Sequence, residues 1–209
     1  MKKIITTVLA ASLMLLGTNA FAQLSVGFGF ANAETKFNAL GIVNAKANLN
    51  GFFAGGTYNL KIGQSGLGIA PGIYFSYLTK NDVDLKVTTM DFTETYVGVP
   101  VDINFTIPIS DGIKGIIYAG PTFSYGISSK GKIGSTEFDL YDGDLKEILT
   151  QTTSIDYKRF DVQLGGGIGL ELYDMIRFTV GYDFGMMDRG SSILEIKRNR
   201  LNVGVAYVF

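Results

Sequence analysis

The sequence predicts an all-β fold, an antiparallel up-and-down transmembrane β-barrel of eight strands. Three observations lead to this prediction. Glycine supplies 27 of the 209 residues, and 15 phenylalanines and 11 tyrosines make the chain rich in aromatic side chains. Several stretches alternate apolar with small or polar residues, which is the two-residue period of a strand. The connections between these stretches are alternately long and short, as in barrels of the outer membrane.

The last stretch, residues 201–209, shows the alternation most clearly. One face carries Leu201, Val203, Val205, Tyr207 and Phe209, and the other carries Asn202, Gly204, Ala206 and Val208. At the edge of a sheet in a soluble protein, such a strand would promote aggregation. In a membrane barrel the first strand pairs with this edge and lipid covers the apolar face. We therefore expect this stretch to close the barrel.

The chain begins with a segment typical of a secretory signal peptide. Lys2 and Lys3 precede a mostly apolar stretch, residues 4–16, and Ala20 and Ala22 form an A-x-A cleavage site. The apolar stretch is short for a spanning helix, which needs about 20 residues. We therefore expect cleavage after Ala22.

Residues 1–22 are thus assigned to the signal peptide and residues 23–209 to one barrel domain. Removing the two N-terminal lysines leaves 16 basic and 19 acidic residues, a net charge of −3, which gives no reason to expect a nucleic-acid partner. The chain has no cysteine, which excludes disulfides and thiolate metal sites. A lipoprotein carries a cysteine directly after its signal peptide. This chain has Gln23 at that position, so we do not expect a lipoprotein.

Eight stretches of about ten residues have the strand period, and this length crosses a bilayer at a tilt. In chain order they are residues 24–31, 48–60, 67–78, 92–105, 115–127, 156–171, 176–186 and 201–209. Their apolar faces include Leu24, Val26, Phe28 and Phe30; Phe52, Ala54, Tyr58 and Leu60; Leu67, Ile69, Ile73, Phe75 and Tyr77; Val97, Val99, Val101, Ile103 and Phe105; Phe160, Val162, Leu164, Ile168 and Leu170; and Ile176, Phe178, Val180, Tyr182, Phe184 and Met186.

Tight turns are expected where glycine, proline and an Asp-Gly pair interrupt the alternation. They are residues 61–66, 107–114 and 172–175, and the long connections are residues 32–46, 79–91, 128–155 and 187–197. With an even strand count, both termini lie on the side of the short turns, which is the periplasmic side in outer membrane barrels.

Two local expectations concern the regularity of the strands. Pro100 has no N–H group to donate, so we expect a β-bulge there. Parts of the connections 32–46 and 128–155 could also extend into hairpins above the membrane, which would raise the strand count to ten.

The charged residues lie on the face opposite the apolar one, and that face is otherwise mostly glycine, alanine and serine. A basic group in mid-bilayer on the lipid side would cost about 2–4 kcal/mol, so the charges should point into the lumen. Buried charges need partners. We therefore expect a lumenal ion-pair network of Glu94, Asp102, Arg159, Asp161, Glu171, Arg177, Asp183, Arg198 and Arg200. Glu171 and Arg177 flank one tight turn and are the expected pair.

The chain contains no histidine, which removes histidine-dependent nucleophilic catalysis and imidazole metal sites. Asp161, Glu171 and Asp183 could do acid–base chemistry, but pairing with lumenal arginines explains them better. The glycine run 165–169 lies inside a strand and is no dinucleotide motif. We therefore expect no enzyme, no catalytic residue and no cofactor.

The connection 128–155 carries closely spaced carboxylates, Asp139, Asp142, Asp144 and Glu147. Carboxylates can bind calcium, but this spacing does not match an EF-hand, so we favour a solvated acidic loop without a metal. Phe138, Leu140 and Tyr141 could instead pack this loop over the barrel mouth or bind a partner.

Several short motifs resemble the PorT-like, porin-like outer-membrane β-barrel family of Bacteroidetes. They are the run 96–101, the run 118–121, and Asp161 followed by Gly165, Gly167 and Gly169. The ending Gly204, Tyr207 and Phe209 resembles the signal that the barrel-assembly machinery reads. The resemblance implies an eight-stranded barrel in outer-membrane lipid of a Gram-negative envelope, handled by periplasmic chaperones and the assembly machinery during biogenesis.

The first functional hypothesis is therefore a non-enzymatic barrel with a closed lumen, because eight strands leave an interior that side chains fill. It would act through its surface loops or through envelope integrity. The alternative is a small-solute channel, which the many lumenal glycines favour. A lipid-acting enzyme is the third hypothesis, and the missing nucleophile–base pairs argue against it.

Overall fold

The computed structural model describes residues 22–39, 43–84, 89–141, 157–190 and 194–209. Its strands are β1 (Ala22–Ala39), β2 (Val43–Ile62), β3 (Leu67–Asp84), β4 (Thr89–Ser110), β5 (Ile113–Ile133), β6 (Thr136–Asp139), β7 (Phe160–Leu172), β8 (Ile176–Gly185) and β9 (Leu194–Val208). Among these residues, none belongs to a helix long and apolar enough to cross a membrane.

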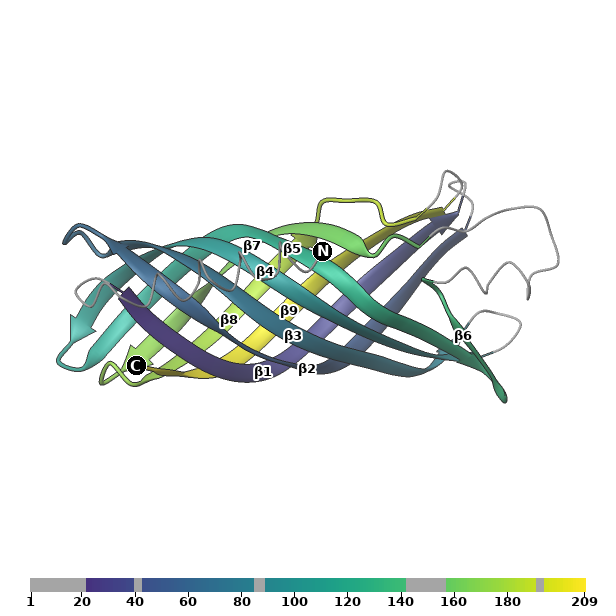
Figure 1. Ribbon diagram of the computed structural model, residues 1–209, viewed down its shortest axis with the longest axis horizontal. Coiled ribbons are helices and arrows are strands. Elements are labelled where there is room, and N and C mark those ends of the chain that lie inside the picture. The colour runs from purple at the N-terminus through teal and green to yellow at the C-terminus, as the bar shows by residue number, and fades with distance from the viewer. Residues whose placement is uncertain (1–21, 40–42, 85–88, 142–156, 191–193) are drawn as a thin grey trace, which may run out of the picture.

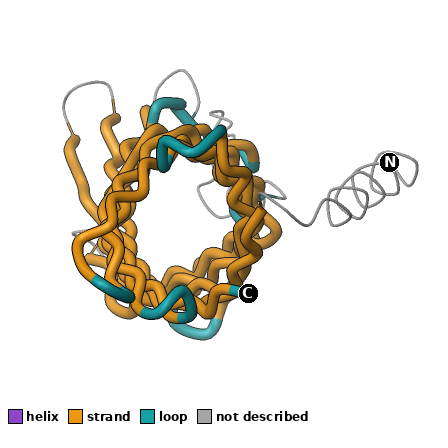
Figure 2. Tube along the Cα trace, turned by 90° about the vertical axis from the view of Figure 1, so that its left-hand side faces the viewer, coloured by secondary structure: helices purple, strands orange, loops and turns teal. Residues whose placement is uncertain are grey.

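Eight of these strands form a closed ring of antiparallel neighbours, which confirms the predicted fold class (Figure 2). The order around the ring is β4-β3-β2-β1-β9-β8-β7-β5, and β5 pairs with β4 to complete it. The last strand closes on the first, from Ser25 opposite Val208 to Ala39 opposite Leu194. Closure gives the backbone groups of the first and last strands partners in each other, so neither is left as a free edge.

The short turns gather at the end of the barrel that carries Phe209 (Figure 1). Gly63, Gly66 and Gly112 adopt positive φ in two of these turns, a conformation that glycine tolerates without a Cβ clash. The Phe209 N–H donates to the Leu24 carbonyl oxygen at 2.8 Å, so the C-terminus lies beside the start of β1.

The strands are longer than the apolar alternation predicted. β1 has 18 residues, β2 has 20 and β4 has 22, where about ten were expected. Beyond Phe30, the outward side chains of β1 become polar at Asn32, Glu34 and Lys36, and Glu34 pairs with Lys36 at 3.2 Å. Backbone pairing does not require apolar side chains, so the ladders continue past the apolar band. Much of the predicted connections 32–46 and 79–91 is therefore strand.

The predicted connection 128–155 begins as a hairpin. β5 runs on to Ile133 and pairs with β6, from Lys130 opposite Asp139 to Ile133 opposite Thr136. This hairpin lies at the end opposite Phe209 and adds a strand to the sheet without joining the ring (Figure 1).

The predicted β-bulge at Pro100 is wrong. The pairs Pro71–Val101 and Tyr74–Gly98 keep one register across this level, and the shifts lie elsewhere, at Lys80/Val83, Thr95/Tyr96 and Pro108/Ser110. Proline removes a donor but adds no residue, so the ladder loses a pair without slipping.

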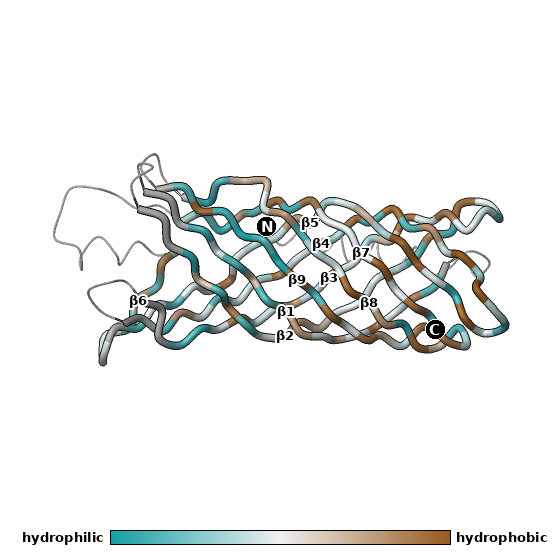
Figure 3. The backbone as a smooth tube through the Cα atoms, turned by 180° about the vertical axis from the view of Figure 1, so that it is seen from behind, coloured by the Kyte–Doolittle hydropathy of each residue, from teal (hydrophilic) through white to brown (hydrophobic). Residues whose placement is uncertain are grey.

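The alternating faces point as predicted. The apolar parity is exposed on the outside, with Phe28 at 66%, Ile168 at 64% and Phe184 at 57% exposure. Small and polar residues face the lumen, and many of them are buried. Figure 3 shows that hydrophobic residues concentrate toward the end that carries the C-terminus, whereas the opposite end is more hydrophilic. An exterior of this kind fits a lipid environment around that part of the barrel.

Lumenal glycines allow neighbouring strands and side chains to approach closely. A Cβ on Gly29 would collide with the Val203 carbonyl oxygen and lie 2.6 Å from Cζ of Phe53. We expect Gly29→Ala to lower the free energy of unfolding by about 1–3 kcal/mol, because the backbone oxygen cannot move aside. The matched control is Gly98→Ala, whose Cβ would meet Thr122 at an ordinary 3.5 Å. Urea titration of the refolded mature barrel measures both variants, and equal losses would contradict the close packing at Gly29.

Candidate functional site in the barrel lumen

A buried carboxylate, Glu94 of β4, lies at the centre of the lumenal polar groups. It is 0% exposed. Its Oε1 accepts hydrogen bonds from Arg189 at 2.7 Å, from the Tyr141 hydroxyl at 3.0 Å and from the Tyr157 hydroxyl at 3.4 Å. Its Oε2 accepts one from Arg198 of β9 at 3.1 Å. We call these five residues the Glu94 cluster.

The Glu94 cluster connects residues of the loops to two strands of the ring, β4 and β9. Tyr141 follows β6, Tyr157 precedes β7, and Arg189 lies between β8 and β9. The two tyrosine rings stack at 5.3 Å, and the Arg189 guanidinium lies 4.5 Å from the centre of the Tyr157 ring. Both ends of the β6–β7 connection, and the β8–β9 connection, are therefore anchored on one carboxylate inside the barrel mouth.

Arg198 extends the cluster across the lumen. It donates to Asp161 of β7 at 3.0 Å and lies 4.1 Å from the centre of the Tyr96 ring. Arg198 is 1% exposed and Asp161 is 0% exposed. The charges are paired as desolvated charges must be.

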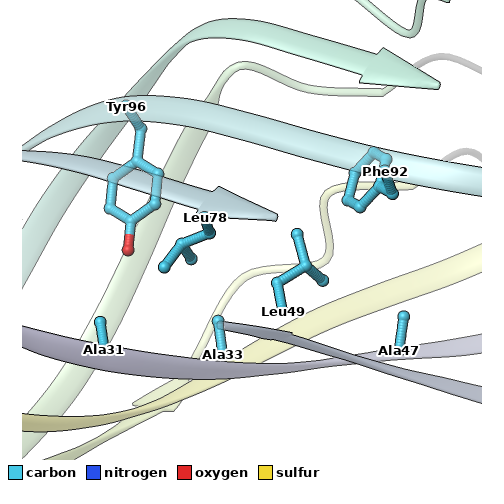
Figure 4. Packing of buried hydrophobic residues seen from close by; sticks show 7 residues of the cluster. All are labelled: Ala31, Ala33, Ala47, Leu49, Leu78, Phe92 and Tyr96. Carbon is cyan, nitrogen blue, oxygen red and sulfur yellow. The ribbon is translucent and has the colours of Figure 1, made fainter. Parts of the chain in front are cut away.

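Apolar side chains fill the lumen beside the Glu94 cluster. The buried members are Ala31, Ala33, Ala47, Leu49, Leu78, Phe92 and Tyr96, which come from β1 to β4 (Figure 4). Leu140 packs against them, and Phe138 of β6 is buried as well. This agrees with the first of the two alternatives for Phe138, Leu140 and Tyr141, which was packing over the mouth. Apolar and charged groups together occupy the half of the lumen away from Phe209.

A second charged group lies next to Tyr96. Arg200 of β9 pairs with Asp183 of β8 at 3.1 Å and donates to the Tyr96 hydroxyl at 3.2 Å. The Asn202 side chain donates to the same Asp183 oxygen at 2.8 Å. Tyr96 therefore links this group to Arg198.

The third group lies at the end with the short turns. Arg177 donates twice to Oε2 of Glu171, at 2.6 and 3.0 Å, and Glu171 is 2% exposed. Lys114 lies 3.8 Å from the other Glu171 oxygen and also pairs with Asp174 in the turn. These are the two residues expected to pair across the turn.

The nine charged residues do not form one network as expected. Seven of them lie in the three groups just described. Arg159 instead donates to the carbonyl oxygens of Gly126 and Ile127 and lies 4.5 Å from the centre of the Tyr141 ring. Its position before β7, where the strand ladder has not yet begun, brings it to carbonyl groups of β5. Asp102 faces the lumen but makes no ion pair with another described residue.

The sequence did not identify Arg189 or Tyr157 as members of the site. Arg189 lies in a predicted connection, where no strand period assigns a direction to a side chain. Tyr157 lies in the predicted strand 156–171 on the same face as Arg159 and Asp161, but as an uncharged residue it was not counted among the ion-pair partners. The sequence Asp188-Arg189-Gly190 does signal a turn, and the Asp188 carboxylate accepts from the Gly190 N–H at 2.8 Å. This turn directs Arg189 into the mouth.

The described residues contain no cluster of His, Cys, Asp and Glu that could hold a metal ion. Of the carboxylates considered for calcium, Asp142, Asp144 and Glu147 lie outside the described residues. Asp139 accepts a hydrogen bond from the Tyr141 N–H at 2.8 Å.

On the hairpin outside the ring, an ion pair with Lys130 at 2.5 Å lowers the pKa of Glu137.

An apolar exterior around a lumen of paired charges defines an integral β-barrel of the membrane. A family model described as outer membrane protein beta-barrel domain matches residues 17–189. The chain therefore belongs to this family of outer membrane barrels.

Solved structures share the fold at low sequence identity. Ail, the attachment invasion locus protein of Yersinia pestis, crystallised with the heparin analogue sucrose octasulfate, is 13% identical; the match covers 91% of this chain and 100% of Ail, with a TM-score of 0.51. OprG of Pseudomonas aeruginosa is 11% identical; the match covers 92% of this chain and 98% of OprG, with a TM-score of 0.51. The matches also include the outer membrane enzyme PagL, at 9% identity, 90% and 98% coverage, and a TM-score of 0.45. A comparison with curated proteins found no significant match.

Replacing Glu94 tests the energetic role of the cluster. We expect Glu94→Ala to lower the free energy of unfolding by about 3–5 kcal/mol, because it leaves the buried Arg189 and Arg198 without their shared carboxylate. The control is Glu137→Ala, which removes an exposed ion pair and should cause no measurable change. Urea unfolding of both refolded barrels measures the difference. A loss no larger than that of the control would mean that water replaces the carboxylate at the mouth.

Proposed function

We propose that the protein is a non-enzymatic outer membrane barrel with a closed lumen, and that it acts through its outer connections or through envelope integrity. The observation that carries this proposal is the Glu94 cluster. It joins β4, β9 and two connections inside the mouth, next to a packed apolar group. Opening this half of the lumen would separate buried charges from their partners, which is strongly unfavourable.

The carboxylates that could have served an enzyme are engaged in structural pairs. Asp161 binds Arg198, Glu171 binds Arg177, and Asp183 binds Arg200. General acid–base catalysis needs a group that is free to exchange its proton with a substrate. The chain has no histidine that could activate a nucleophile.

The proposal places both termini in the periplasm and the β5–β6 hairpin outside the cell. The short turns and Phe209 share one end, which is the periplasmic end in barrels of this architecture. Tyr207 and Phe209 are exposed on the outer wall at that end, 46% and 69%. There they could contact lipid and be read, together with Gly204, by the barrel-assembly machinery after delivery by periplasmic chaperones. Membership of the PorT-like group within the wider family is part of this proposal.

One observation favours a small-solute channel as the second candidate. The half of the lumen nearer Phe209 contains a cavity of about 130 Å³ with glycines such as Gly27 and Gly204 in its wall. Such a cavity could form part of a path if the Glu94 cluster opened.

Single-channel recording in a planar bilayer separates the two candidates. We expect the refolded mature barrel to show no steady openings, with heat-modifiable gel migration as the control for folding. Arg198→Ala should make the barrel conduct ions. The variant loses the hydrogen bonds that connect Glu94 and Asp161 through Arg198, and it loses the guanidinium that lies over the Tyr96 ring. Lys197→Ala is the matched control, since Lys197 is an exposed neighbour paired only with Glu195 among the described residues. Steady openings of the wild-type barrel would favour the channel instead, with Arg177 and Asp183 as the residues to test for selectivity.

A further inference from the structure

The lumen contains a cavity between the Glu94 cluster and the end of the barrel that carries Phe209. It is about 130 Å³ in volume and is bordered by residues from seven of the eight strands of the ring, all but β7. Small barrels with eight strands have interiors that either are filled by side chains or hold one small ligand.

Glycines keep the cavity open by letting aromatic side chains lie against the wall. The Phe53 ring lies over Gly29 and Gly204, where its Cζ would be 2.6 and 2.9 Å from added Cβ atoms. The Tyr118 side chain likewise lies over Gly167 and Gly181, on the two strands next to its own along the sheet. With these rings against the wall, the space at the centre remains free.

A second pair of glycines brings two carboxylates toward one another. Gly120 of β5 pairs with Gly165 of β7. Asp102 reaches over Gly120 from β4, with Oδ1 2.8 Å from the position of an added Cβ, and Asp183 reaches over Gly165 from β8. Both Asp102 and Asp183 line the cavity.

One carboxylate of the lining lies outside the ion pairs of the described residues. Arg177 is held by Glu171, and Arg200 is held by Asp183. Asp102 makes no hydrogen bond or ion pair with the other described residues. A carboxylate in a lumen of low dielectric either takes up a proton or has a cation beside it.

Two side-chain amides at the cavity also have oxygen atoms that accept no hydrogen bond from the described residues. Asn104 is 6% exposed and donates to Asn59 at 2.8 Å, but its own Oδ1 accepts no hydrogen bond from the described residues. Asn202 donates to Asp183, and its buried Oδ1 is likewise without a donor in that part of the chain. The residues around the cavity thus include two acceptors without donors and one carboxylate outside the ion pairs, a set that a ligand with donors and a positive charge would complement.

We propose that this cavity binds one small protonated primary amine, with Asp102 as its counter-charge and the side-chain oxygens of Asn104 and Asn202 as acceptors. An ammonium group has three donors, which matches this set of acceptors. The rings of Phe53 and Tyr118 border the same space and suit a cation with an apolar tail. A bare metal ion fits less well, because the described residues provide no cluster of three ligating side chains. The proposal goes beyond the closed-lumen function, since a barrel can hold an amine whether or not it conducts.

The test uses the refolded mature barrel in detergent micelles and four small probes at pH 7. Propylammonium is the ligand probe, propan-1-ol its neutral analogue, propionate its anionic analogue, and tetramethylammonium a cation without N–H donors. Side-chain amide signals of Asn104 and Asn202, followed by NMR, report binding in the cavity. We expect propylammonium to shift both signals saturably, tetramethylammonium to bind more weakly, and the neutral and anionic probes to cause no saturable shift.

A substitution then tests the counter-charge. We expect Asp102→Asn to weaken propylammonium binding by about tenfold or more, because it removes a charge-assisted hydrogen bond. Glu137→Gln, on the exposed hairpin, is the control and should leave binding unchanged. The proposal is overturned if propylammonium gives no saturable shift, if propan-1-ol binds as tightly, or if Asp102→Asn binds it as well as the wild type does. Should Asp102→Asn not fold, the comparison of the four probes on the wild-type barrel still decides.

Discussion

The structure depends on one constraint, which is that every strand must pair on both sides when lipid surrounds the sheet. An unpaired backbone N–H or C=O group in a bilayer costs several kcal/mol. The ladder between β1 and β9 removes the last free edges and brings Phe209 beside Leu24. Because the ring closes in this way, the outward side chains can be apolar throughout the band, and charged residues at the level of the band must lie inside. The lumenal groups are a consequence of that closure.

Most of the described charges inside this narrow ring are paired, although Asp102 is not, and the pairs lie at different levels along the lumen. Glu94 faces two arginines and two tyrosine hydroxyls at the mouth, whereas Glu171 and Arg177 pair near the short turns. Buried ion pairs contribute little net stability compared with apolar residues, but a wrong partner costs much. We interpret these groups as devices that fix the register of the strands and the position of the connections.

The sequence predicted the ring and the direction of its side chains, because a period of two residues is set by backbone geometry alone. It also identified Glu171 and Arg177 as neighbours, since a tight turn places its flanking residues opposite each other. It did not predict where the strands end, because the ladders continue where Asn32, Glu34 and Lys36 replace apolar side chains. Arg189 was missed for a related reason: residues in connections have no period that assigns them to a side. Tyr157 lay on the lumenal face of the predicted strand 156–171, but only charged residues were considered as members of the network. Asp102 was predicted to pair and does not, since sequence parity places a charge in the lumen without naming its partner.

The composition of the Glu94 cluster has a consequence for the order of assembly. Glu94 and Arg198 are separated by 104 positions in the chain, and Glu94 and Arg189 by 95. Contacts between such distant positions require that the chain first lose the entropy of a large loop. Glu94 enters with β4, while its arginines arrive only with the last strand and the connection before it. A chain that has inserted half of its strands therefore holds an unneutralised carboxylate facing the forming lumen, and the mouth can close only in the final step of folding.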